Sequence, residues 1–352
     1  MLQDISDTTL VALVGLFGGI LLGLAARLGR FCTLGAIEDL LYQNSDTRMR
    51  MWGLAIATAI IGSFALIGTG VLSPEKTMYL SQAWMPLASI LGGLMFGYGM
   101  ALAGNCGFGA LARLGGGDLR SFVIVVVMGL SAYVTLSGPL AALRVRAFPA
   151  TPADPDRLPG LADALARLTG LAPVTIGLSI GVILFLIALS SRAMLAKPGT
   201  VIWATVVGLA IVSGWAGTSL VAEAGLDAVP VMSHTYSAPI GETMLYAMTA
   251  SGSSLSFGVG SVAGVWTGAF IGSLIKGHFR WEACEDPREL RRQIIGAAIM
   301  GVGAVIAMGC TIGQGISAFS VLAFSAPVTF LAILAGAALG LRQLITGFAR
   351  VA

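Results

Sequence analysis

The sequence predicts an all-α polytopic membrane protein of about nine transmembrane helices with short re-entrant helices, arranged as two inverted, pseudo-symmetric halves. Three observations support this fold class: an apolar composition, recurring apolar runs of about twenty residues, and a repeated cysteine motif. Hydrophobic residues make up 56% and charged residues 11% of the 352 residues, and the mean hydropathy is +0.89. Such a chain is expected to lie mostly in lipid.

The apolar runs define the predicted spans and the charged connections define their direction. The spans are 10–26, 51–72, 84–104, 121–142, 174–191, 200–217, 255–275, 293–309 and 327–346. The first ten residues contain no Lys or Arg, so the first run is expected to be retained in the membrane rather than cleaved as a signal peptide. The two alternating sets of connections carry 15 and 5 basic residues, with Arg342 near the end of the last span counted with the C-terminus. By the positive-inside rule, the N-terminus is expected outside the cell and the C-terminus in the cytoplasm.

One segment, 143–173, is polar and Pro-rich and lies near the midpoint of the chain. It predicts an external linker, with a short surface helix over "LADALARL", between an N-terminal half, 1–142, and a C-terminal half, 174–352. Glycines recur inside the predicted spans at four-residue spacing, which predicts close helix packing in lipid. These sets are Gly15-Gly19-Gly23, Gly93-Gly97, Gly264-Gly268-Gly272 and Gly336-Gly340.

Two of the four cysteines lie in matching glycine-rich settings, "GNCGFG" at Cys106 and "GCTIG" at Cys310. Aligning the two cysteines superimposes further small residues at the same offset: Gly92 on Gly296, Gly97 on Gly301, Gly99 on Gly303, Ala103 on Ala307 and Gly109 on Gly313. A weaker third copy surrounds Cys32, with Gly18, Gly23 and Gly35 at the same offsets. Cys106 ends the third predicted span and Cys310 ends the eighth, so the two copies are expected to run in opposite directions. Inverted repeats with broken helices are typical of secondary transporters.

The cysteine pattern favours a pathway for a soft anion over the usual structural roles. Zinc and iron–sulfur sites need closely spaced ligand pairs, which this chain lacks, and a disulfide is not expected near the reducing cytoplasmic side. A small buried hydrophobe is the alternative for each cysteine and the preferred interpretation of Cys284. In the three motifs, glycine follows at the third position, so the turn is expected to expose the thiol and the backbone N–H groups of the next half-helix to an anion. A thiol donor suits a soft acceptor such as sulfur.

The motifs "GRFCTLGA", "GNCGFGAL", "GHFRWE" and "GCTIGQGISAFS" together resemble the YeeE/YedE family of bacterial inner-membrane sulfur-compound transporters, over nearly the whole chain. The resemblance implies an hourglass-shaped fold with re-entrant helices, and import of thiosulfate by S–H···S hydrogen bonds at a constriction. The expected substrate-binding residues are Cys32, Cys106, Cys310, Gly35, Gly107, Gly109, Thr311 and Gly313. The resemblance also implies a small cytoplasmic sulfur-carrier protein as a receiver of the product.

The sequence leaves functions other than thiosulfate import open. One alternative is transport of another sulfur or selenium species; others are a membrane redox protein using thiols or quinone, and a non-transporting subunit of a membrane complex. We expect no enzymatic activity, cofactor or bound metal, because no C-x-x-C, haem, flavin or Walker A pattern occurs. The net charge of +3 does not indicate a nucleic-acid partner. The basic residues Arg27, Arg30, Lys276 and Arg280 are candidates for anion steering, with positive-inside anchoring as the alternative.

Overall fold

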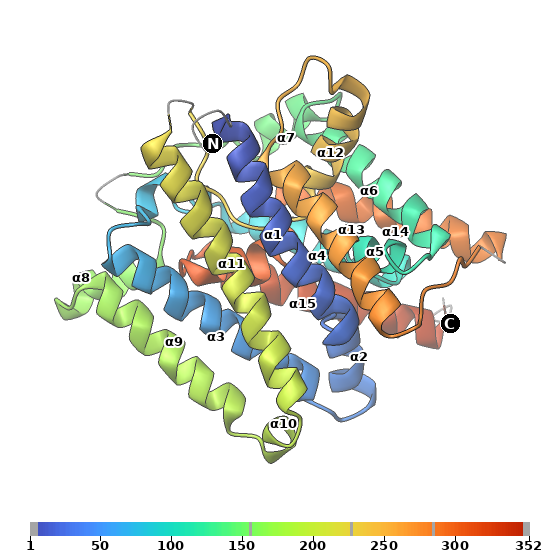
Figure 1. The fold of residues 1–352 in the computed structure, drawn as a ribbon, viewed down its shortest axis with the longest axis horizontal. Coiled ribbons are helices and arrows are strands. Elements are labelled where there is room, and N and C mark those ends of the chain that lie inside the picture. Colours follow the sequence, from blue (N-terminus) through green and yellow to red (C-terminus); the bar gives the residue numbers. More distant parts are fainter. Residues whose placement is uncertain (1–5, 155–156, 226–227, 284–285, 348–352) are drawn as a thin grey trace, which may run out of the picture.

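The computed structural model describes residues 6–154, 157–225, 228–283 and 286–347, and it is a bundle of helices (Figure 1). The long helices are α1 (Asp7–Leu28), α3 (Thr47–Gly68), α4 (Pro86–Ala103), α6 (Leu119–Leu136), α9 (Pro173–Leu189), α11 (Pro198–Ala224), α13 (Phe257–Ile275), α14 (Pro287–Ile306) and α15 (Ser325–Thr346). The short ones are α2 (Thr33–Tyr42), α5 (Gly107–Leu114), α7 (Ala141–Ala147), α8 (Leu161–Thr169), α10 (Arg192–Leu195), α12 (Ala238–Thr249), the 3₁₀ turn η1 (Pro74–Lys76) and the π-helical turn η2 (Gly313–Ala318). The prediction of an all-helical polytopic membrane protein is confirmed.

The number of spans depends on whether α9, which is short, and α14, which begins with charged residues, are counted as membrane-spanning. Within the described residues, seven helices are long and apolar enough to cross a membrane, and eight if α8 and α9, bent by 116°, form one span. The nine predicted spans correspond to the nine long helices, but α9 has only 17 residues. The first two turns of α14 carry the charged residues Arg288, Glu289, Arg291 and Arg292. The count of nine therefore stays a prediction.

The glycine faces lie where helices cross most closely. A Cβ atom at Gly19 of α1 would collide with the backbone of α13 at Ser261 and Gly264. A Cβ at Gly97 of α4 would likewise collide with the backbone of α15 at Ile333. In lipid, where burial of apolar surface does not drive helices together, such backbone contact supplies the packing energy. The prediction that these glycines pack helices is confirmed for both crossings.

The helix contacts fall into matching pairs between the two parts of the chain. The contact of α1 with α13 corresponds to that of α11 with α3. The contact of α4 with α15 corresponds to that of α14 with α6, and the contact of α2 with α15 corresponds to that of α12 with α6. Exchanging α1 with α11, α2 with α12, α3 with α13, α4 with α14 and α6 with α15 thus preserves these contacts. Helix α9, which packs on α3 at one edge of the bundle (Figure 1), has no counterpart in this exchange. The inverted halves stay a prediction with which this pairing agrees.

The segment 143–173 is docked on the bundle. The amide of Leu161 donates to the carbonyl of Leu322 at 2.8 Å, and the amide of Ala83 donates to the carbonyl of Thr151 at 2.9 Å. The predicted short helix over "LADALARL" is present as α8. The role of segment 143–173 as a boundary between two halves stays a prediction. The two backbone hydrogen bonds connect this segment to the loop before the third predicted span and to the loop after the eighth.

Candidate functional site

Each of the three motif cysteines follows a break in which one residue adopts a left-handed backbone. Two positions before Cys32, Cys106 and Cys310, the φ angles are 55° at Arg30, 78° at Gly104 and 56° at Met308. A left-handed residue commonly ends an α-helix, because it redirects the chain so that the following backbone N–H groups can bond to the carbonyls of the last turn. The same local geometry therefore ends α1, α4 and α14, and it places each thiol at the start of the following turn.

Two of the cysteine sulfurs accept the same kind of backbone hydrogen bond, from the glycine three residues later. The amide of Gly109 donates to the Cys106 sulfur at 3.4 Å, and the amide of Gly313 donates to the Cys310 sulfur at 3.5 Å. Cys32 begins α2 without such a side-chain bond. Because each sulfur acts here as an acceptor, its S–H proton stays available to a further partner.

The Cys310 thiol is held by a segment remote in sequence. The amide of Tyr236 donates to its sulfur at 3.3 Å, and the Thr235 hydroxyl lies 3.7 Å away. The segment is itself anchored, since the Ser317 hydroxyl donates to the carbonyl of His234 at 2.7 Å. His234 and Tyr236 lie in the connection between α11 and α12, which the sequence assigns to the loop between the spans 200–217 and 255–275. The structure shows that both are fully buried. A low-charge loop gives no sequence signal for such burial.

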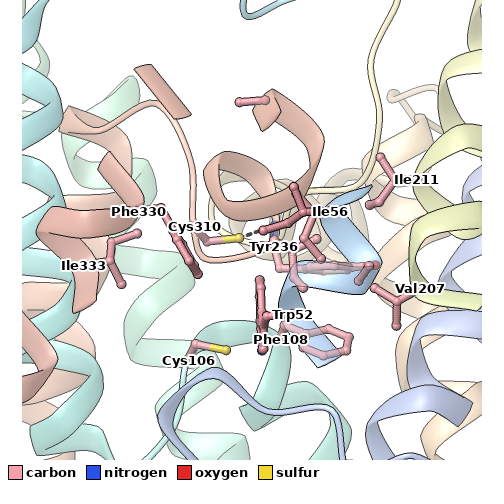
Figure 2. Packing of buried hydrophobic residues seen from close by; sticks show 14 of the residues in the cluster. Trp52, Ile56, Cys106, Phe108, Val207, Ile211, Tyr236, Cys310, Phe330 and Ile333 are labelled. Carbon is pink, nitrogen blue, oxygen red and sulfur yellow. Dashed lines mark hydrogen bonds between the residues drawn. The ribbon is translucent and has the colours of Figure 1, made fainter. Parts of the chain in front are cut away.

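Aromatic rings surround the two buried thiols (Figure 2). Phe108, two residues after Cys106, packs on Tyr236 with ring centroids 5.4 Å apart. Trp52 stacks on Phe31, beside Cys32, at 4.6 Å, and on Phe330 at 5.5 Å. These rings close the space around Cys106 and Cys310, and the two residues are 2% and 0% exposed. The site is therefore narrow and largely apolar.

Two cavities reach this narrow region from opposite ends of α4. The first, here the Tyr79 cavity, has a volume of about 440 Å³ and is lined by Tyr79, Thr235 and the first turn of α4 at Ala88 and Ser89. The second, the Cys32 cavity, has a volume of about 450 Å³ and is lined by Cys32 and by Gly104, which directly follows α4. The end of α14, through Gly309, lines the Tyr79 cavity instead. Helices α4 and α14 thus end at different cavities.

The Cys32 cavity is basic. Its lining includes Arg27, Arg30, Arg48, Arg113 and Lys276, with Glu38 as the acidic residue. Three of the four candidate steering residues, Arg27, Arg30 and Lys276, therefore lie together, and their role in steering stays a prediction. Arg48 and Arg113 were missed, although both are basic residues a short distance after a cysteine motif. The fourth candidate, Arg280, is not among the lining residues; its side chain is 78% exposed and pairs with Glu282 at 3.4 Å.

Two of the basic residues also have structural contacts. Lys276 donates to the carbonyl oxygen of Arg27 at 2.8 Å, at the end of α1, and Arg27 donates to the Ser273 hydroxyl at 2.6 Å. Burial, and then the charges of Arg30 and Arg27, lower the pKa of the Lys276 ammonium below its usual value. A group of cations that repel one another is stabilised when an anion enters.

The glycines of the motifs make room for specific neighbours. A Cβ at Gly35 would collide with the Arg48 guanidinium, which lies beside Cys32. A Cβ at Gly107 would lie 2.6 Å from the Met128 sulfur, and one at Gly313 would lie 2.5 Å from the Thr235 hydroxyl. The structure thus brings Gly107 and Gly109 to Cys106, and Thr311 and Gly313 to Cys310. Cys284 lies outside the described residues.

The chemistry of the site follows from its thiols. Cys32, Cys106 and Cys310 are free cysteines. Among the residues that the structure describes, no three His, Cys, Asp or Glu side chains are grouped so as to hold a metal ion. The arrangement offers soft S–H donors, two of them buried, between a basic cavity and a second, more apolar one.

The chain is similar to known transport proteins. The family model described as sulphur transport matches residues 28–339. Over 321 residues, the chain is 26% identical to a protein of Escherichia coli (strain K12) named thiosulfate transporter TsuA, with 86% of each chain covered. It is 25% identical over 321 residues to a protein of the same name from Spirochaeta thermophila, covering 88% of this chain and 92% of that one. The matched region includes all three motif cysteines, and the chain belongs to the sulphur transport (YeeE/YedE) family.

Proposed function

We propose that this protein imports thiosulfate, or a closely related sulfur anion, across the bacterial inner membrane through the passage between its two cavities. The observation that carries the proposal is the placement of Cys106 and Cys310. Both are buried in matching turns, one at the end of α4 beside the Cys32 cavity and one at the end of α14 beside the Tyr79 cavity. The names of the relatives identify thiosulfate as the first substrate to test.

The thiols suit a substrate that combines negative charge with a soft sulfur atom. Their sulfurs already accept N–H donors from Gly109, Gly313 and Tyr236, so each S–H proton is free to donate to the terminal sulfur of thiosulfate. A neutral thiol binds the anion without adding negative charge that would repel it. Several weak, sequential contacts let the anion enter and leave, as transport requires. In this account, the substrate passes from Cys310 to Cys106 and then to Cys32.

The direction of import follows from the charges. The Cys32 cavity carries the basic residues that the positive-inside rule assigns to the cytoplasmic side. We therefore propose that the Tyr79 cavity opens to the periplasm, that the N-terminus is periplasmic and that the C-terminus is cytoplasmic. The inverted relation of α4 and α14 supports this arrangement. A cytoplasmic sulfur-carrier protein that receives the product is a further expectation from the family.

Growth on thiosulfate tests the function. A bacterium that lacks thiosulfate uptake is supplied with this protein and given thiosulfate as its sole sulfur source. We expect growth with the wild type and with the control Cys284→Ala, and no growth with Cys106→Ala or Cys310→Ala at equal membrane levels. A stable wild-type protein that does not support growth would contradict thiosulfate import. Parallel cultures on sulfite, sulfate and selenium species then separate another substrate from a non-transporting subunit.

A further inference from the structure

Several buried hydrogen-bond donors near the thiols have no well-aligned partner, among them the Trp52 indole N–H. Three others are on polar side chains of the cysteine turns or of a cavity wall. They are the hydroxyl of Tyr79, the hydroxyl of Thr311 and the side-chain amide nitrogen of Asn105, and within the described part of the chain none is close and well aligned enough with an acceptor to form a hydrogen bond. The Tyr79 hydroxyl has only a loose contact with the Thr235 hydroxyl, and the Thr311 hydroxyl only a loose contact with the Cys106 sulfur. The residues are 5%, 0% and 2% exposed. A buried donor without an acceptor destabilises a folded protein. Such groups in a passage indicate an acceptor that is supplied by what passes through.

Position distinguishes these three donors from other unpartnered groups. Thr329 also has a buried hydroxyl without a partner, but it lies within α15, outside the cysteine turns, and it lines neither cavity. Thr311 also lines neither cavity, but it directly follows Cys310 in the cysteine turn. Tyr79 lines the Tyr79 cavity, and its hydroxyl lies 3.0 Å from the position of a Cβ at Gly313, whose amide donates to the Cys310 sulfur. Tyr79 is thus beside the first thiol of the passage.

The other two donors continue the same path. Thr311 follows Cys310 in the chain, and its hydroxyl faces the Cys106 sulfur in a weak side-chain contact that an anion oxygen could replace. Asn105 precedes Cys106 and lines the Cys32 cavity. The donors therefore form a series, Tyr79, Thr311 and Asn105, that runs from one cavity to the other along the thiols.

The chemistry of the proposed substrate explains why two kinds of donor would be needed. Thiosulfate has a soft terminal sulfur and a sulfonate group with three hard oxygen acceptors. Thiols are weak donors suited to sulfur, whereas O–H and N–H groups form stronger bonds to oxygen, particularly when the acceptor carries charge. We propose that Tyr79, Thr311 and Asn105 bind the oxygen atoms of the transported anion while the cysteines bind its terminal sulfur. This inference rests on the proposed function.

The consequence is selectivity for a sulfur anion that also carries oxygens. A site with buried donors rejects a ligand without acceptors, because its donors are then left unpaired. Hydrosulfide and polysulfide ions have soft sulfur but no oxygen atoms. We therefore expect both ions to compete poorly with thiosulfate for passage, even though the thiols alone would accept them.

Thr311→Val provides the sharpest test, because valine has nearly the same shape and lacks only the hydroxyl. If the Thr311 hydroxyl has no ligand, its removal relieves an unpartnered buried group, and the variant should be equally or more stable with unchanged transport. If it binds the anion, uptake should fall by about tenfold or more, the effect of losing one hydrogen bond to a charged group. Thr311→Ser keeps the hydroxyl and should retain uptake, and Thr329→Val is the matched control.

The measurement is uptake of radiolabelled thiosulfate into proteoliposomes, with the melting temperature of each variant. The expected result is loss of uptake in Thr311→Val, with a melting temperature at or above that of the wild type and with normal uptake in Thr311→Ser and Thr329→Val. Tyr79→Phe and Asn105→Leu give independent tests and should also lower uptake. Wild-type uptake with equal uptake by folded Thr311→Val and Tyr79→Phe overturns this inference alone. A wild type that takes up no thiosulfate overturns the proposed function, and this inference with it.

Discussion

The amide of Tyr236 donates a hydrogen bond to the sulfur of Cys310 at 3.3 Å, across 74 positions of the chain. This contact, with the bond from Gly313 at 3.5 Å, fixes the thiol between the end of α14 and the buried segment at 231–237. Both donors are backbone groups. The position of the sulfur is therefore set by the fold, and its chemistry can be changed without disturbing the turn.

Cys310→Ser should separate the role of the fold from that of the soft donor. A serine oxygen can accept the same backbone N–H groups, so we expect the melting temperature to change by only a few degrees, in line with a loss of about 1 kcal/mol. The hydroxyl, however, is a poor partner for a terminal sulfur, and uptake of thiosulfate should fall by at least about tenfold. Uptake assays and thermal unfolding check this, and wild-type uptake by the serine variant would contradict a thiol-specific step.

Cys32 should be the most reactive of the three thiols and should react from the cytoplasmic side. It is partly exposed, whereas Cys106 and Cys310 are buried. In a Cys284→Ala background, a membrane-impermeant maleimide is expected to label inside-out vesicles faster than right-side-out vesicles. Adding Cys32→Ala should remove most of this labelling. Faster labelling from the periplasmic side would show that the topology is reversed.

Arg113→Gln should weaken transport through the charge of the Cys32 cavity. Arg113 lines this cavity, and its positive charge repels that of Arg27. Replacing Arg113 by a neutral residue removes this repulsion, so the substitution should not destabilise the fold. We expect several-fold lower uptake at low ionic strength and a smaller difference at high salt, where screening weakens steering. Arg280→Gln is the control, because its exposed side chain does not line the cavity. Equal effects of the two substitutions would rule out a specific role of the cavity charge.

Gly19→Ala should destabilise the crossing of α1 and α13. The new methyl group would meet the backbone of Ser261 and Gly264, and the resulting overpacking is expected to cost about 1–3 kcal/mol. Gly199→Ala, in the first turn of α11, meets no atom within 4 Å and should be neutral or stabilising by up to about 1 kcal/mol. Melting temperatures in detergent test the pair, and equal values would show that close backbone approach does not stabilise this crossing.

The sequence predicted those features that depend on local pattern. Apolar runs identified the long helices, glycine spacing identified the two close crossings, and the repeat around Cys106 and Cys310 identified turns that share a left-handed residue and an N–H···S bond. These features follow from residues that are close together in the chain. The left-handed residue was not itself predicted, because only at Gly104 is it a glycine.

Contacts between distant segments were not predictable in the same way. The burial of His234 and Tyr236 depends on packing against α13 and η2. The residues near them in the sequence do not indicate these contacts. Arg48 reaches the site because Gly35 leaves space for its guanidinium, and Arg280 misses it because its side chain points to solvent. In both cases, the path of the chain after the motif, and not the residue type, determines whether the arginine side chain reaches the Cys32 cavity.

The most direct test of the central claim is uptake of radiolabelled thiosulfate by purified protein in proteoliposomes, comparing the wild type with Cys106→Ala and Cys310→Ala. We expect the wild type to accumulate label at a rate that unlabelled thiosulfate suppresses, and each variant to reach no more than the rate of protein-free liposomes while keeping a native melting temperature. Uptake by folded Cys106→Ala and Cys310→Ala at the wild-type rate would contradict passage along these thiols.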